Sequence, residues 1–493
     1  MYLESLINEV EYTCLQGDVH ILVTDLVYDS RKVSKGSVFV CIIGAVSDGH
    51  DYINQVIEKG AAAIVISKDI ELSKDVELSK DVTVIRVNNC RRALAFMSAA
   101  YFDNPAGKLV TIGITGTKGK TTTAYMIKSI LENTGVRTGL IGTIETIIGE
   151  EVIPANNTTP ESYIIQEIFA RMVKEGVQCV VMEASSQGLM QNRMDGFVFD
   201  YGVFTNLGYD HIGGDEHKDF DDYLRCKSRL FRQCRIGLIN VDDEYAERIL
   251  EGHTCQVESF GFSDNANIYA SKVELVHKPG YLGVSYQVKG LMNFDVDIDI
   301  PGKFNVLNSL CAIAICRHFN VNEEDIIKAL AKIKVRGRVE LVPVSGNYSV
   351  MIDYAHNAMS LESLLTTIRE YKPKRLVCVF GCGGNRSKDR RFLMGEISSG
   401  LADLTVVTSD NPRYEEPEDI IRDIVTGVKK GSGKYVAITD RAEAIKFCID
   451  NAMDGDVIII AGKGHEDYQE IKGVKYHMDD RELVRDALTK ANL

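Results

Sequence analysis

The fold of this chain is decided by the stretch Gly113-Ile-Thr-Gly-Thr-Lys-Gly-Lys-Thr-Thr122. The apolar run at 109–114 predicts a buried strand that enters this stretch, and the pattern at 124–134 predicts a helix that leaves it. Glycines in such a turn let backbone N–H groups converge on phosphate oxygens, and the helix adds its positive N-terminus. Lys120 can then reach the β- and γ-phosphates of a nucleotide, and the Thr121 hydroxyl can bind Mg²⁺. We therefore predict a phosphate-binding loop.

The loop departs from the strict phosphate-loop pattern, which has glycine where Ile114 stands. Its glycines lie instead at 113, 116 and 119. An ordinary turn between a strand and a helix is the alternative interpretation. The apolar strand before the loop and the helical pattern after it favour the phosphate site.

Strands and helices alternate through the rest of the chain, which predicts mostly parallel sheets with ligands at the carboxyl ends of the strands. A turn-rich junction at 103–107 and a restart of the alternation near Glu340 divide the pattern. The predicted strands lie at 37–44, 62–66, 82–87, 109–114, 177–183, 201–206, 350–353, 375–380, 404–408 and 457–461. The predicted helices lie at 52–59, 124–134, 361–371, 419–429 and 441–451.

Bulk composition excludes several classes of protein. The chain has 493 residues, and at roughly 150 residues per domain this suggests about three domains. A net charge of −14 makes a general nucleic-acid binder a poor interpretation, although it does not exclude small anionic ligands. The N-terminus has no secretory pattern, and no apolar run approaches 18 residues, so we expect a cytoplasmic protein. The 12 cysteines lack a metal-binding or disulfide spacing, which predicts reduced thiols. Ser67-Lys-Asp69 recurs at Ser73 and Ser79, which predicts a duplicated surface loop.

The chain resembles the Mur ligases, the ATP-dependent amide ligases of peptidoglycan assembly. The resemblance begins with Thr115–Thr122 and continues in order over essentially the whole chain. The matching motifs are Asn157–Pro160, Met182–Ser186, Phe204–His211, Lys227, Pro301–Asn308, Gly337–Glu340 and Asp353–His356, with Asp29–Arg31, Gly44 and Asp48-Gly49 similar to a UDP-sugar site. Within the family the chain is most similar to the members that add the third residue of the peptide, a diamino acid, to UDP-N-acetylmuramoyl-L-alanyl-D-glutamate.

The resemblance implies an α/β fold of three domains. These are a small N-terminal α/β domain that binds the UDP-sugar (1–105), a central parallel-sheet ATPase domain with the phosphate loop (106–337) and a C-terminal Rossmann-like domain that binds the amino acid (338–493). It also implies an ATP-dependent acid–amino-acid ligase, in which the γ-phosphate passes to the D-glutamate γ-carboxylate and an amine attacks the acyl phosphate. The expected protein is a cytoplasmic monomer that acts on small molecules in cell-wall biogenesis, and so in cell shape and division, without nucleic-acid or membrane partners.

The resemblance further assigns the residues of the ATP and metal sites. The implied catalytic residues are Lys120, Glu183, His211, Lys227 and Arg338. The implied ATP contacts are Gly116, Thr117, Lys118, Gly119, Lys120, Thr121, Thr122, Asn305, Asn308, Arg338, Asp353 and His356. Thr121 and Glu183 are the implied ligands of one Mg²⁺ ion. His211 and a carbamylated Lys227 are the implied ligands of a second Mg²⁺ ion. Taken without the resemblance, Lys227 reads as a surface helix lysine, Asn305 and Asn308 as helix caps, and His356 as a hydrogen-bonded loop histidine.

The two remaining ligands of the implied reaction are assigned in the same way. For the UDP-muramoyl dipeptide the implied residues are Tyr28, Ser30, Ala45, Val46, Ser47, Asn157, Thr158, Thr159, Ser185, Gln191, Arg193 and carbamylated Lys227. For the amino acid they are Arg391, Asp410, Asn411, Pro412, Arg413, Gly462 and Glu466.

Asp410-Asn-Pro-Arg413 is similar to the signature of members that add meso-diaminopimelate. Arg413 can hold the distal carboxylate of that substrate, and Glu466 its distal ammonium. A lysine substrate would leave Arg413 facing an ammonium, which is unfavourable. A lysine-adding member, a ligase like folylpolyglutamate synthase and an ATP-driven regulator or motor are the alternatives.

Three positions depart from the usual family pattern. Lys118 stands where asparagine is commonest, Gln187 where histidine is usual and Ala358 where proline is usual. We expect Lys118 to add a cation near the phosphates, Gln187 to cost one polar contact, and Ala358 to loosen the loop on the adenine side.

Overall fold

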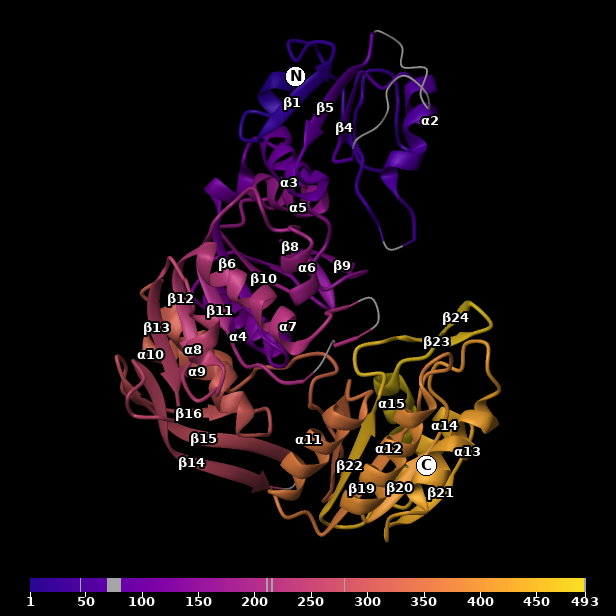
Figure 1. Ribbon diagram of the computed structural model, residues 1–493. Helices are drawn as coiled ribbons and strands as arrows, with labels where there is room; N and C mark the ends of the chain where they lie inside the picture. Colours follow the sequence, from indigo (N-terminus) through magenta and orange to yellow (C-terminus); the bar gives the residue numbers. More distant parts are fainter. Residues whose placement is uncertain (45, 69–80, 210–211, 214–215, 279, 492–493) are drawn as a thin grey trace. The chain divides into compact units, whose positions relative to one another are not determined.

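The computed structural model describes residues 1–44, 46–68, 81–209, 212–213, 216–278 and 280–491. Contacts group these residues into two compact units: Met1–Phe260 with Ala314–Asn320, and Gly261–Ile313 with Val321–Leu493 (Figure 1). Among the described residues the main sheets have 5, 11 and 6 strands. The repeated Ser-Lys-Asp segment at 69–80, Ala45 and His211 lie outside the described residues.

The first 102 residues of the first unit form a small sheet in the order β1-β5-β4-β3-β2, in which only β1 runs antiparallel to its neighbour. Its strands β3 and β4 are apolar and buried on both faces, as inner parallel strands are. The elements are α1 (Leu3–Leu6), β1 (Tyr12–Gln16), β2 (Leu26–Val27), β3 (Val38–Val40), η1 (Gly49–Tyr52), α2 (Ile53–Glu58), β4 (Ala63–Ile66), β5 (Thr83–Val87) and α3 (Cys90–Tyr101). The strands and helix predicted in this part are present, with shorter bounds.

The rest of the first unit is built on strands in the order β13-β12-β11-β6-β10-β7-β8-β9, parallel except at the β7-β8-β9 edge. The strands are β6 (Val110–Thr115), β7 (Thr138–Ile141), β8 (Glu145–Ile148), β9 (Glu151–Pro154), β10 (Cys179–Glu183), β11 (Phe199–Phe204), β12 (Cys234–Asn240) and β13 (Gln256–Gly261). The helices are η2 (Pro105–Lys108), α4 (Lys120–Asn133), α5 (Ser162–Lys174), α6 (Ser186–Met190), α7 (Phe220–Ser228), η3 (Arg229–Arg232) and α8 (Ala246–Ile249). Central strands β6, β10 and β11 end side by side.

The second unit opens with an antiparallel meander that sequence analysis had not predicted. It comprises β14 (Ile268–Lys278), β15 (Tyr281–Gly290) and β16 (Phe294–Ile298), and it is followed by α9 (Phe304–Arg317) and α10 (Glu323–Leu330). Buried and exposed residues alternate along β16, which is the pattern of a strand with one solvated face.

The remainder of the second unit is the predicted doubly wound domain. Its sheet runs β17-β18-β22-β19-β20-β21, with only β17 antiparallel to its neighbour. The strands are β17 (Glu340–Val342), β18 (Ser349–Asp353), β19 (Arg375–Phe380), β20 (Leu404–Val407), β21 (Lys434–Ala437) and β22 (Asp456–Ala461), and β23 (Tyr468–Ile471) with β24 (Val474–His477) forms a separate hairpin. The helices are α11 (Ala358–Arg369), α12 (Lys388–Leu401), α13 (Pro417–Val428), α14 (Arg441–Asp450) and α15 (Asp480–Ala491).

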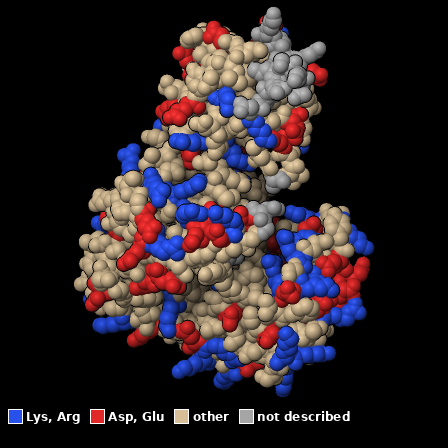
Figure 2. Space-filling view, viewed as in Figure 1, with Lys and Arg blue, Asp and Glu red and all other residues tan. Residues whose placement is uncertain are grey.

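The face of the molecule drawn in Figure 2 does not carry the net negative charge as one continuous acidic field. On the face seen in Figure 2, basic and acidic side chains alternate over both units. No helix among the described residues is long and apolar enough to cross a membrane. Each of the 12 cysteines is a free thiol, and all but Cys14 are buried.

A fully buried ion pair joins the helices and strands of the doubly wound domain. Arg441, the first residue of α14, donates from Nε and Nη2 to the two carboxylate oxygens of Asp480, both at 2.7 Å. Its guanidinium also donates to the backbone carbonyls of Ala461, at the end of β22, and Ser409, just after β20. Neither charged side chain is exposed to solvent. The pair therefore fixes the strand ends against α15.

Replacing Arg441 with methionine should destabilise the protein by about 3–5 kcal/mol, because Asp480 would keep a buried charge without its partner. Urea unfolding followed by far-UV circular dichroism measures this loss. The double variant Arg441→Met with Asp480→Leu should lose less, because no unpaired charge remains. Equal losses in the single and double variants would contradict this role for the pair.

Candidate active site

The predicted phosphate loop connects β6 to α4 and requires glycine at two positions. Gly116 has φ 149° and Gly119 has φ 86°, backbone conformations that favour glycine. A Cβ atom on Gly116 would lie 1.9 Å from the Thr205 hydroxyl, so no larger residue fits there. Lys120 and Thr121 open helix α4, whose N-terminus therefore faces the loop.

Asn206, just after β11, holds the loop in this shape. Its side-chain Oδ1 accepts from the backbone N–H of Lys118 at 2.9 Å, and its Nδ2 donates to the Lys118 carbonyl at 3.0 Å. The Thr205 hydroxyl donates to the same carbonyl at 2.7 Å. The two peptide groups that flank the Lys118 Cα atom are thus both fixed by the residues at the end of β11. Sequence analysis quoted Asn206 within a motif but gave it no role.

Two lysine ammonium groups meet at one carbonyl of the loop. Lys120 Nζ and Lys227 Nζ each donate to the Gly116 carbonyl at 2.8 Å, and Lys120 also donates to the Thr117 carbonyl at 3.0 Å. Lys227 lies on α7, is 1% exposed, and its ammonium lies 4.5 Å from the centre of the Tyr223 ring. The alternative interpretation of Lys227 as a surface lysine is therefore wrong, because the structure buries it against the loop.

Hydrogen-bond donors surround the carboxylate of Glu183 at the end of β10. Its carboxylate accepts from the Thr121 hydroxyl at 3.1 Å, and from the Thr143 hydroxyl and N–H at 2.9 Å each. A Cβ atom on Gly142 would lie 2.5 Å from this carboxylate, so a glycine beside it leaves the necessary room. Buried carboxylate and hydroxyl oxygens are the ligand type that Mg²⁺ prefers, and Thr121 and Glu183 therefore fit the predicted metal site. His211, the other predicted metal ligand besides Lys227, lies outside the described residues.

The residues predicted to bind the UDP-muramoyl dipeptide divide into two groups. Thr159 donates from its hydroxyl to the Glu183 carbonyl at 2.7 Å and accepts from the Ser185 N–H at 3.0 Å. Arg193 donates to the Thr159 carbonyl and to the Gln191 side chain, each at 2.7 Å. Thr158 contacts the Thr143 hydroxyl at 3.1 Å, so this group continues directly from the Glu183 cluster.

The other predicted dipeptide residues that the structure describes lie in loops. Val46 is fully exposed, Asn157 is exposed, and the Ser30 carbonyl accepts from Lys59 at 2.7 Å. The Ser47 carbonyl accepts from Gly44. Tyr28 packs its ring 5.9 Å from that of Tyr163.

An ion pair that sequence analysis missed lies beside these residues. Arg91 donates to the Glu161 carboxylate at 2.6 Å and to the Ile43 carbonyl at 3.1 Å, so it joins the loop before Val46 to the start of α5. Arg193 Nε lies 3.8 Å from the same carboxylate. Burial, then the Glu161 charge, raise the pKa of Tyr28. The pair spans 70 residues of sequence, and no local pattern indicates it.

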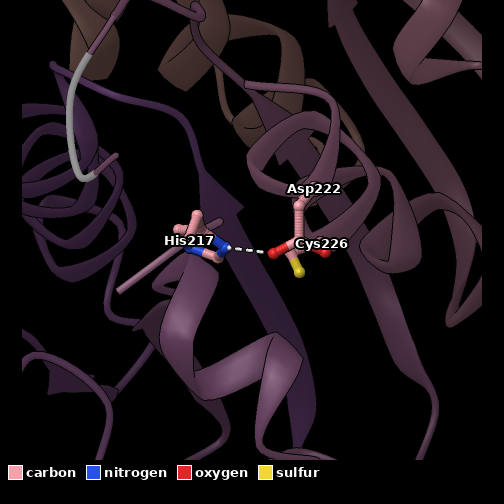
Figure 3. A group of neighbouring side chains, drawn as sticks. All are labelled: His217, Asp222 and Cys226. Atoms are coloured by element: carbon pink, nitrogen blue, oxygen red, sulfur yellow. Dashed lines mark hydrogen bonds and ion pairs between the residues drawn. The ribbon is translucent and has the colours of Figure 1, made fainter. Parts of the chain in front are cut away.

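Three possible metal ligands, His217, Asp222 and Cys226, lie within 4.8 Å of one another near the start of α7 (Figure 3). His217 Nδ1 contacts the Asp222 carboxylate at 3.2 Å, and its ring packs 5.0 Å from that of Tyr223. Asp222 and Cys226 are one helical turn apart. The His217–Asp222 contact closes the turn that precedes the helix.

In the second unit, the two asparagines predicted to contact ATP, Asn305 and Asn308, are buried in helix α9. Asn305 donates to the Pro301 carbonyl at 2.7 Å, and Asn308 donates to Asn305 Oδ1 at 2.9 Å. A helix cap accepts hydrogen bonds from the first turn, whereas Asn305 lies inside the helix and donates backwards. The capping interpretation is therefore wrong for both residues.

Arg338 and His465 both pack against the Tyr354 ring at the carboxyl end of β18. The Arg338 guanidinium lies 5.0 Å from the Tyr354 ring centre, and the His465 ring lies 4.8 Å from it on the glycine loop after β22. A Cβ atom on Gly337 would lie 2.2 Å from the backbone nitrogen of His465, so glycine permits this close approach. Burial, and then the charges of Arg338 and neighbouring arginines, lower the pKa of His465 to about 4.

Asp353 and His356 lie next to these three side chains. Asp353 accepts from the N–H groups of Val339 and Ala355, both at 2.8 Å, and burial raises its pKa although the Arg338 charge opposes this. His356 contacts the Tyr354 carbonyl at 2.9 Å, and burial lowers its pKa. A hydrogen-bonded loop histidine, one of the two interpretations of His356, is what the structure contains. Ala358 begins helix α11, which Asn357 caps by accepting from Ser360.

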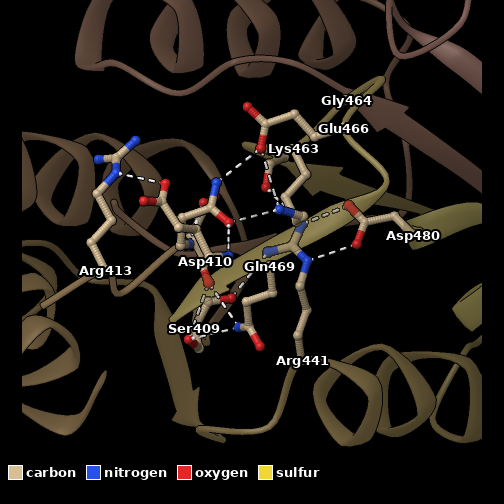
Figure 4. A network of polar contacts seen from close by, with 12 residues as sticks. Ser409, Asp410, Arg413, Arg441, Lys463, Gly464, Glu466, Gln469 and Asp480 are labelled. Carbon is tan, nitrogen blue, oxygen red and sulfur yellow. Dashed lines mark hydrogen bonds and ion pairs between the residues drawn. The ribbon is translucent and has the colours of Figure 1, made fainter. Parts of the chain in front are cut away.

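The predicted acceptor residues form a polar network at the ends of β20 and β22 (Figure 4). Asn411 donates to Glu466 at 2.9 Å, and the fully buried ammonium of Lys463 contacts both Asn411 and Glu466, at 3.2 and 3.3 Å. Gln469 donates to the Asp410 carbonyl at 2.7 Å. A Cβ atom on Gly462 would lie 2.8 Å from the Asp410 carboxylate. Lys463 and Gln469 were not predicted.

Arg391 and Arg413 have different surroundings. Arg391 is 1% exposed and donates to Glu415 at 2.7 Å and Asp423 at 2.9 Å, so its guanidinium is held inside the protein. Arg413, which follows Pro412, has a positive φ of 53° and is about a quarter exposed. Its guanidinium is therefore the more accessible of the two for an acceptor.

Comparison with known proteins identifies the family of the chain. Three family models match in order: the Mur ligase family catalytic domain at residues 22–102, the Mur ligase middle domain at 114–316, and the Mur ligase glutamate ligase domain at 337–464. A protein of Clostridium acetobutylicum named UDP-N-acetylmuramoyl-L-alanyl-D-glutamate--2,6-diaminopimelate ligase 1 is 42% identical over 487 residues, which are 98% of each chain. The chain belongs to the Mur ligase family.

Further relatives support the same placement. The Clostridium perfringens protein of the corresponding ligase name is 41% identical to this Mur ligase over 99% of both chains. A solved structure titled as that ligase superposes with a TM-score of 0.74 at 26% identity, and it covers 100% of this chain and 99% of its own. The predicted family and the predicted α/β Mur ligase fold are confirmed.

Replacing Asn206 with alanine should weaken nucleotide binding by this Mur ligase about tenfold or more. The Lys118 N–H would lose its acceptor, and the Lys118 carbonyl would keep only the Thr205 hydroxyl as a donor. Titration of ADP by calorimetry measures the change. Asn451→Ala, at an exposed asparagine after α14, is the matched control and should bind normally. Unchanged affinity in a folded Asn206→Ala protein would contradict the role of Asn206.

The depressed pKa of His465 predicts acid sensitivity. The unfolded chain takes up a proton as the pH falls below the ordinary histidine pKa of 6.5, whereas the folded chain does so only near 4. Stability is therefore complete above pH 6.5 and is lost as the pH falls towards 4. Between about pH 7.5 and about pH 5 this group should cost up to about 2 kcal/mol of unfolding free energy. Urea unfolding at both pH values should show a smaller loss in His465→Gln, and an equal loss would contradict the assignment.

Proposed function

We propose that this Mur ligase is of the MurE type and joins meso-2,6-diaminopimelate to the D-glutamate of UDP-N-acetylmuramoyl-L-alanyl-D-glutamate, with ATP as the energy source. Support comes from relatives of that printed name that match over 98–99% of both chains. The observation that carries the choice of acceptor is the partly exposed guanidinium of Arg413 beside the buried polar network of Asn411, Lys463 and Glu466. A diamino acid with a distal carboxylate is complementary to such a site.

We assign one substrate to each predicted domain. Residues 1–105 would bind the UDP-sugar, 106–337 ATP, and 338–493 the diamino acid. The enzyme would act as a monomer in the cytoplasm on small molecules, in the synthesis of peptidoglycan precursors.

The residues of the phosphate loop fit the transfer of a phosphoryl group to a carboxylate. Two anions must approach each other, so positioning and charge neutralisation supply most of the catalysis. Lys120 and the N-terminus of α4 would neutralise charge on the γ-phosphate. Thr121 and Glu183 would hold Mg²⁺, which when bound neutralises phosphate charge. Arg193 would hold the dipeptide carboxylate, and the amine of the acceptor would attack the acyl phosphate and release phosphate.

Carbamylation of Lys227 is part of this proposal. The unmodified side chain places a second ammonium group on the Gly116 carbonyl that Lys120 already contacts. Addition of CO₂ to the amine of Lys227 would replace that cation with a carboxylate-like anion and supply oxygen ligands for a hard cation. The burial of Lys227 against the loop supports a role at the phosphates over a role in solubility.

The alternatives differ in their acceptor. A lysine-adding member would have no use for Arg413, and a ligase like folylpolyglutamate synthase would have no use for a UDP-sugar domain. A regulator or motor would hydrolyse ATP without any acceptor. The observations favour the diaminopimelate-adding ligase because they include both the N-terminal domain and the Arg413 cluster.

Phosphate release from ATP should require the UDP-muramoyl dipeptide and meso-diaminopimelate together. Malachite-green measurement of phosphate, with each substrate added singly and then jointly, tests this. L-lysine and L-glutamate in place of diaminopimelate serve as acceptor controls and should support little release. Release that needs neither the dipeptide nor a diamino acid would refute the ligase proposal.

Lys227→Ala should lower kcat by about 100-fold or more, because the carbamate oxygens that would bind a cation at the phosphates are lost. Millimolar acetate or formate should restore part of this activity by supplying the missing carboxylate. Lys328→Ala, at an exposed lysine paired with Glu324, is the control and should keep normal activity. Full activity of Lys227→Ala without any added carboxylate would refute the carbamate.

A further inference from the structure

Three side chains on and just before helix α7 bring their polar atoms together. One ring nitrogen of His217, one carboxylate oxygen of Asp222 and the Sγ atom of Cys226 all lie within 4.8 Å of one another (Figure 3). Asp222 and Cys226 are four residues apart on α7, a spacing that puts both side chains on the same face of the helix. His217 comes from the loop that precedes the helix. The group belongs to none of the binding sites described above.

The His217–Asp222 contact explains only part of this group. His217 Nδ1 lies 3.2 Å from Asp222 Oδ2, which joins the loop to the helix. Cys226 is 2% exposed and is a free thiol, for which the described part of the chain offers no hydrogen-bond partner. A histidine–aspartate pair that only closed a turn would be served equally well by an apolar side chain at position 226. The buried thiol beside the pair therefore points to a further role.

The three ligand types together suit a borderline divalent ion such as Zn²⁺. Thiolate sulfur, imidazole nitrogen and carboxylate oxygen are the usual zinc ligands in proteins. Mg²⁺ instead prefers oxygen atoms alone, which is what Thr121 and Glu183 offer. The Arg225 guanidinium lies 3.7 Å from Asp222 Oδ1, so Oδ2 is the oxygen left for a bond to an ion.

The separations between the three atoms are close to those that a tetrahedral ion requires. Bonds of about 2.1 Å to nitrogen and oxygen place these two ligand atoms about 3.4 Å apart, and a bond of about 2.3 Å to sulfur places it about 3.6 Å from either. The His217–Asp222 separation of 3.2 Å is already close to the first value. Cys226 Sγ would need to move by at most about 1 Å.

The site is also accessible to an ion. The side chain of His217 has no exposed surface, whereas that of Asp222 is 26% exposed. An ion can therefore enter from solvent on the Asp222 side, and a water molecule can occupy the fourth ligand position there.

We propose that His217, Asp222 and Cys226 bind one Zn²⁺ ion, with a water molecule as the fourth ligand. The Cys226 thiol gives its proton to solvent when the zinc–sulfur bond forms, and no electron is transferred. The ion joins the loop before α7 to the last turn of that helix, so its role is structural. The site does not depend on the identity of the substrates and goes beyond the proposed function.

Tyr223 links this site to the phosphate loop. The His217 ring packs 5.0 Å from the Tyr223 ring, and the Tyr223 hydroxyl lies 3.0 Å from that of Thr117. The centre of the same ring lies 4.5 Å from the Lys227 ammonium. An ion bound to His217 thus holds a ring that contacts both the loop and Lys227, and Zn²⁺ should stabilise this part of the protein against unfolding.

Co²⁺ is the probe for the test, because it occupies zinc sites and a thiolate ligand gives it a charge-transfer absorption band in the near ultraviolet. It is titrated into the full-length chain in a buffer with excess Mg²⁺, so that sites made of oxygen atoms alone are already filled. Four proteins are compared: the wild type, Cys226→Ala, Asp222→Asn and the control Cys14→Ala. Cys14 is the one exposed cysteine and therefore reports adventitious binding.

The wild type and Cys14→Ala should bind one Co²⁺ ion per chain and show the thiolate band. Cys226→Ala should lose the band. Asp222→Asn should keep the band but bind Co²⁺ about 10-fold more weakly or worse, because the loss of a direct ligand costs at least as much as the loss of its supporting partner. Zn²⁺ should raise the thermal unfolding midpoint, followed by circular dichroism, in the wild type and Cys14→Ala and not in Cys226→Ala.

Four outcomes would overturn the proposal. A wild type without the thiolate band would show that Cys226 is no ligand, and so would a band that persists in Cys226→Ala. Loss of the band in Cys14→Ala would assign it to an adventitious ion on the exposed thiol. Equal stabilisation of all four proteins by Zn²⁺ would place the ion elsewhere. Asp222→Asn keeps both buried ligands, so unchanged affinity in that variant overturns the proposal even if Cys226→Ala does not fold.

Discussion

The hydrogen bonds between the Lys118 backbone and the side chains of Asn206 and Thr205 set the shape of the loop at which we propose that phosphate binds. Strands β6 and β11 are parallel neighbours, so the loop that leaves one and the polar residues that end the other meet at the same edge of the sheet. Gly116 lies within contact of Thr205, and any side chain there would push the loop away from the strand. Every role that we propose for Lys120, Thr121 and Lys227 therefore requires the close packing of the end of β11 against the glycine loop.

In the second unit, several charged side chains are buried close together. Lys463 is balanced by Glu466, Arg441 by Asp480, and Arg391 by Glu415 and Asp423, so each of these buried cations has an anion in direct contact. Arg413 and Glu470 repeat this pairing where solvent has access. The net charge of −14 consequently says little about binding, because the cations that meet anionic substrates are each held by local partners.

Much of the fold could be predicted because it follows from local patterns. The apolar runs at 375–380 and 457–461 correspond to β19 and β22 almost residue for residue. The glycine spacing predicted the loop between β6 and α4, because glycine spacing and helix initiation are local properties. The meander β14–β16 was missed, because its alternation of buried and exposed residues was not weighed against the parallel pattern around it.

The contacts that complete the sites could not be predicted in this way. Lys227 lies among polar residues on α7, and only tertiary packing reveals that it is buried. Arg91 with Glu161 and Arg413 with Glu470 are pairs separated by 70 and 57 residues, and no local pattern links their members. Pairing across elements depends on the sheet order, which a single sequence does not specify.

We propose that the phosphoryl group of ATP passes to a substrate carboxylate and not to water. Labelling the γ-carboxylate of the D-glutamate residue with ¹⁸O, and following the released phosphate by ³¹P NMR during turnover with diaminopimelate, distinguishes the two routes. Each phosphate should carry one oxygen from the carboxylate, because that oxygen bridges the acyl phosphate and leaves with phosphorus. Unlabelled phosphate released at the rate of product formation would contradict it.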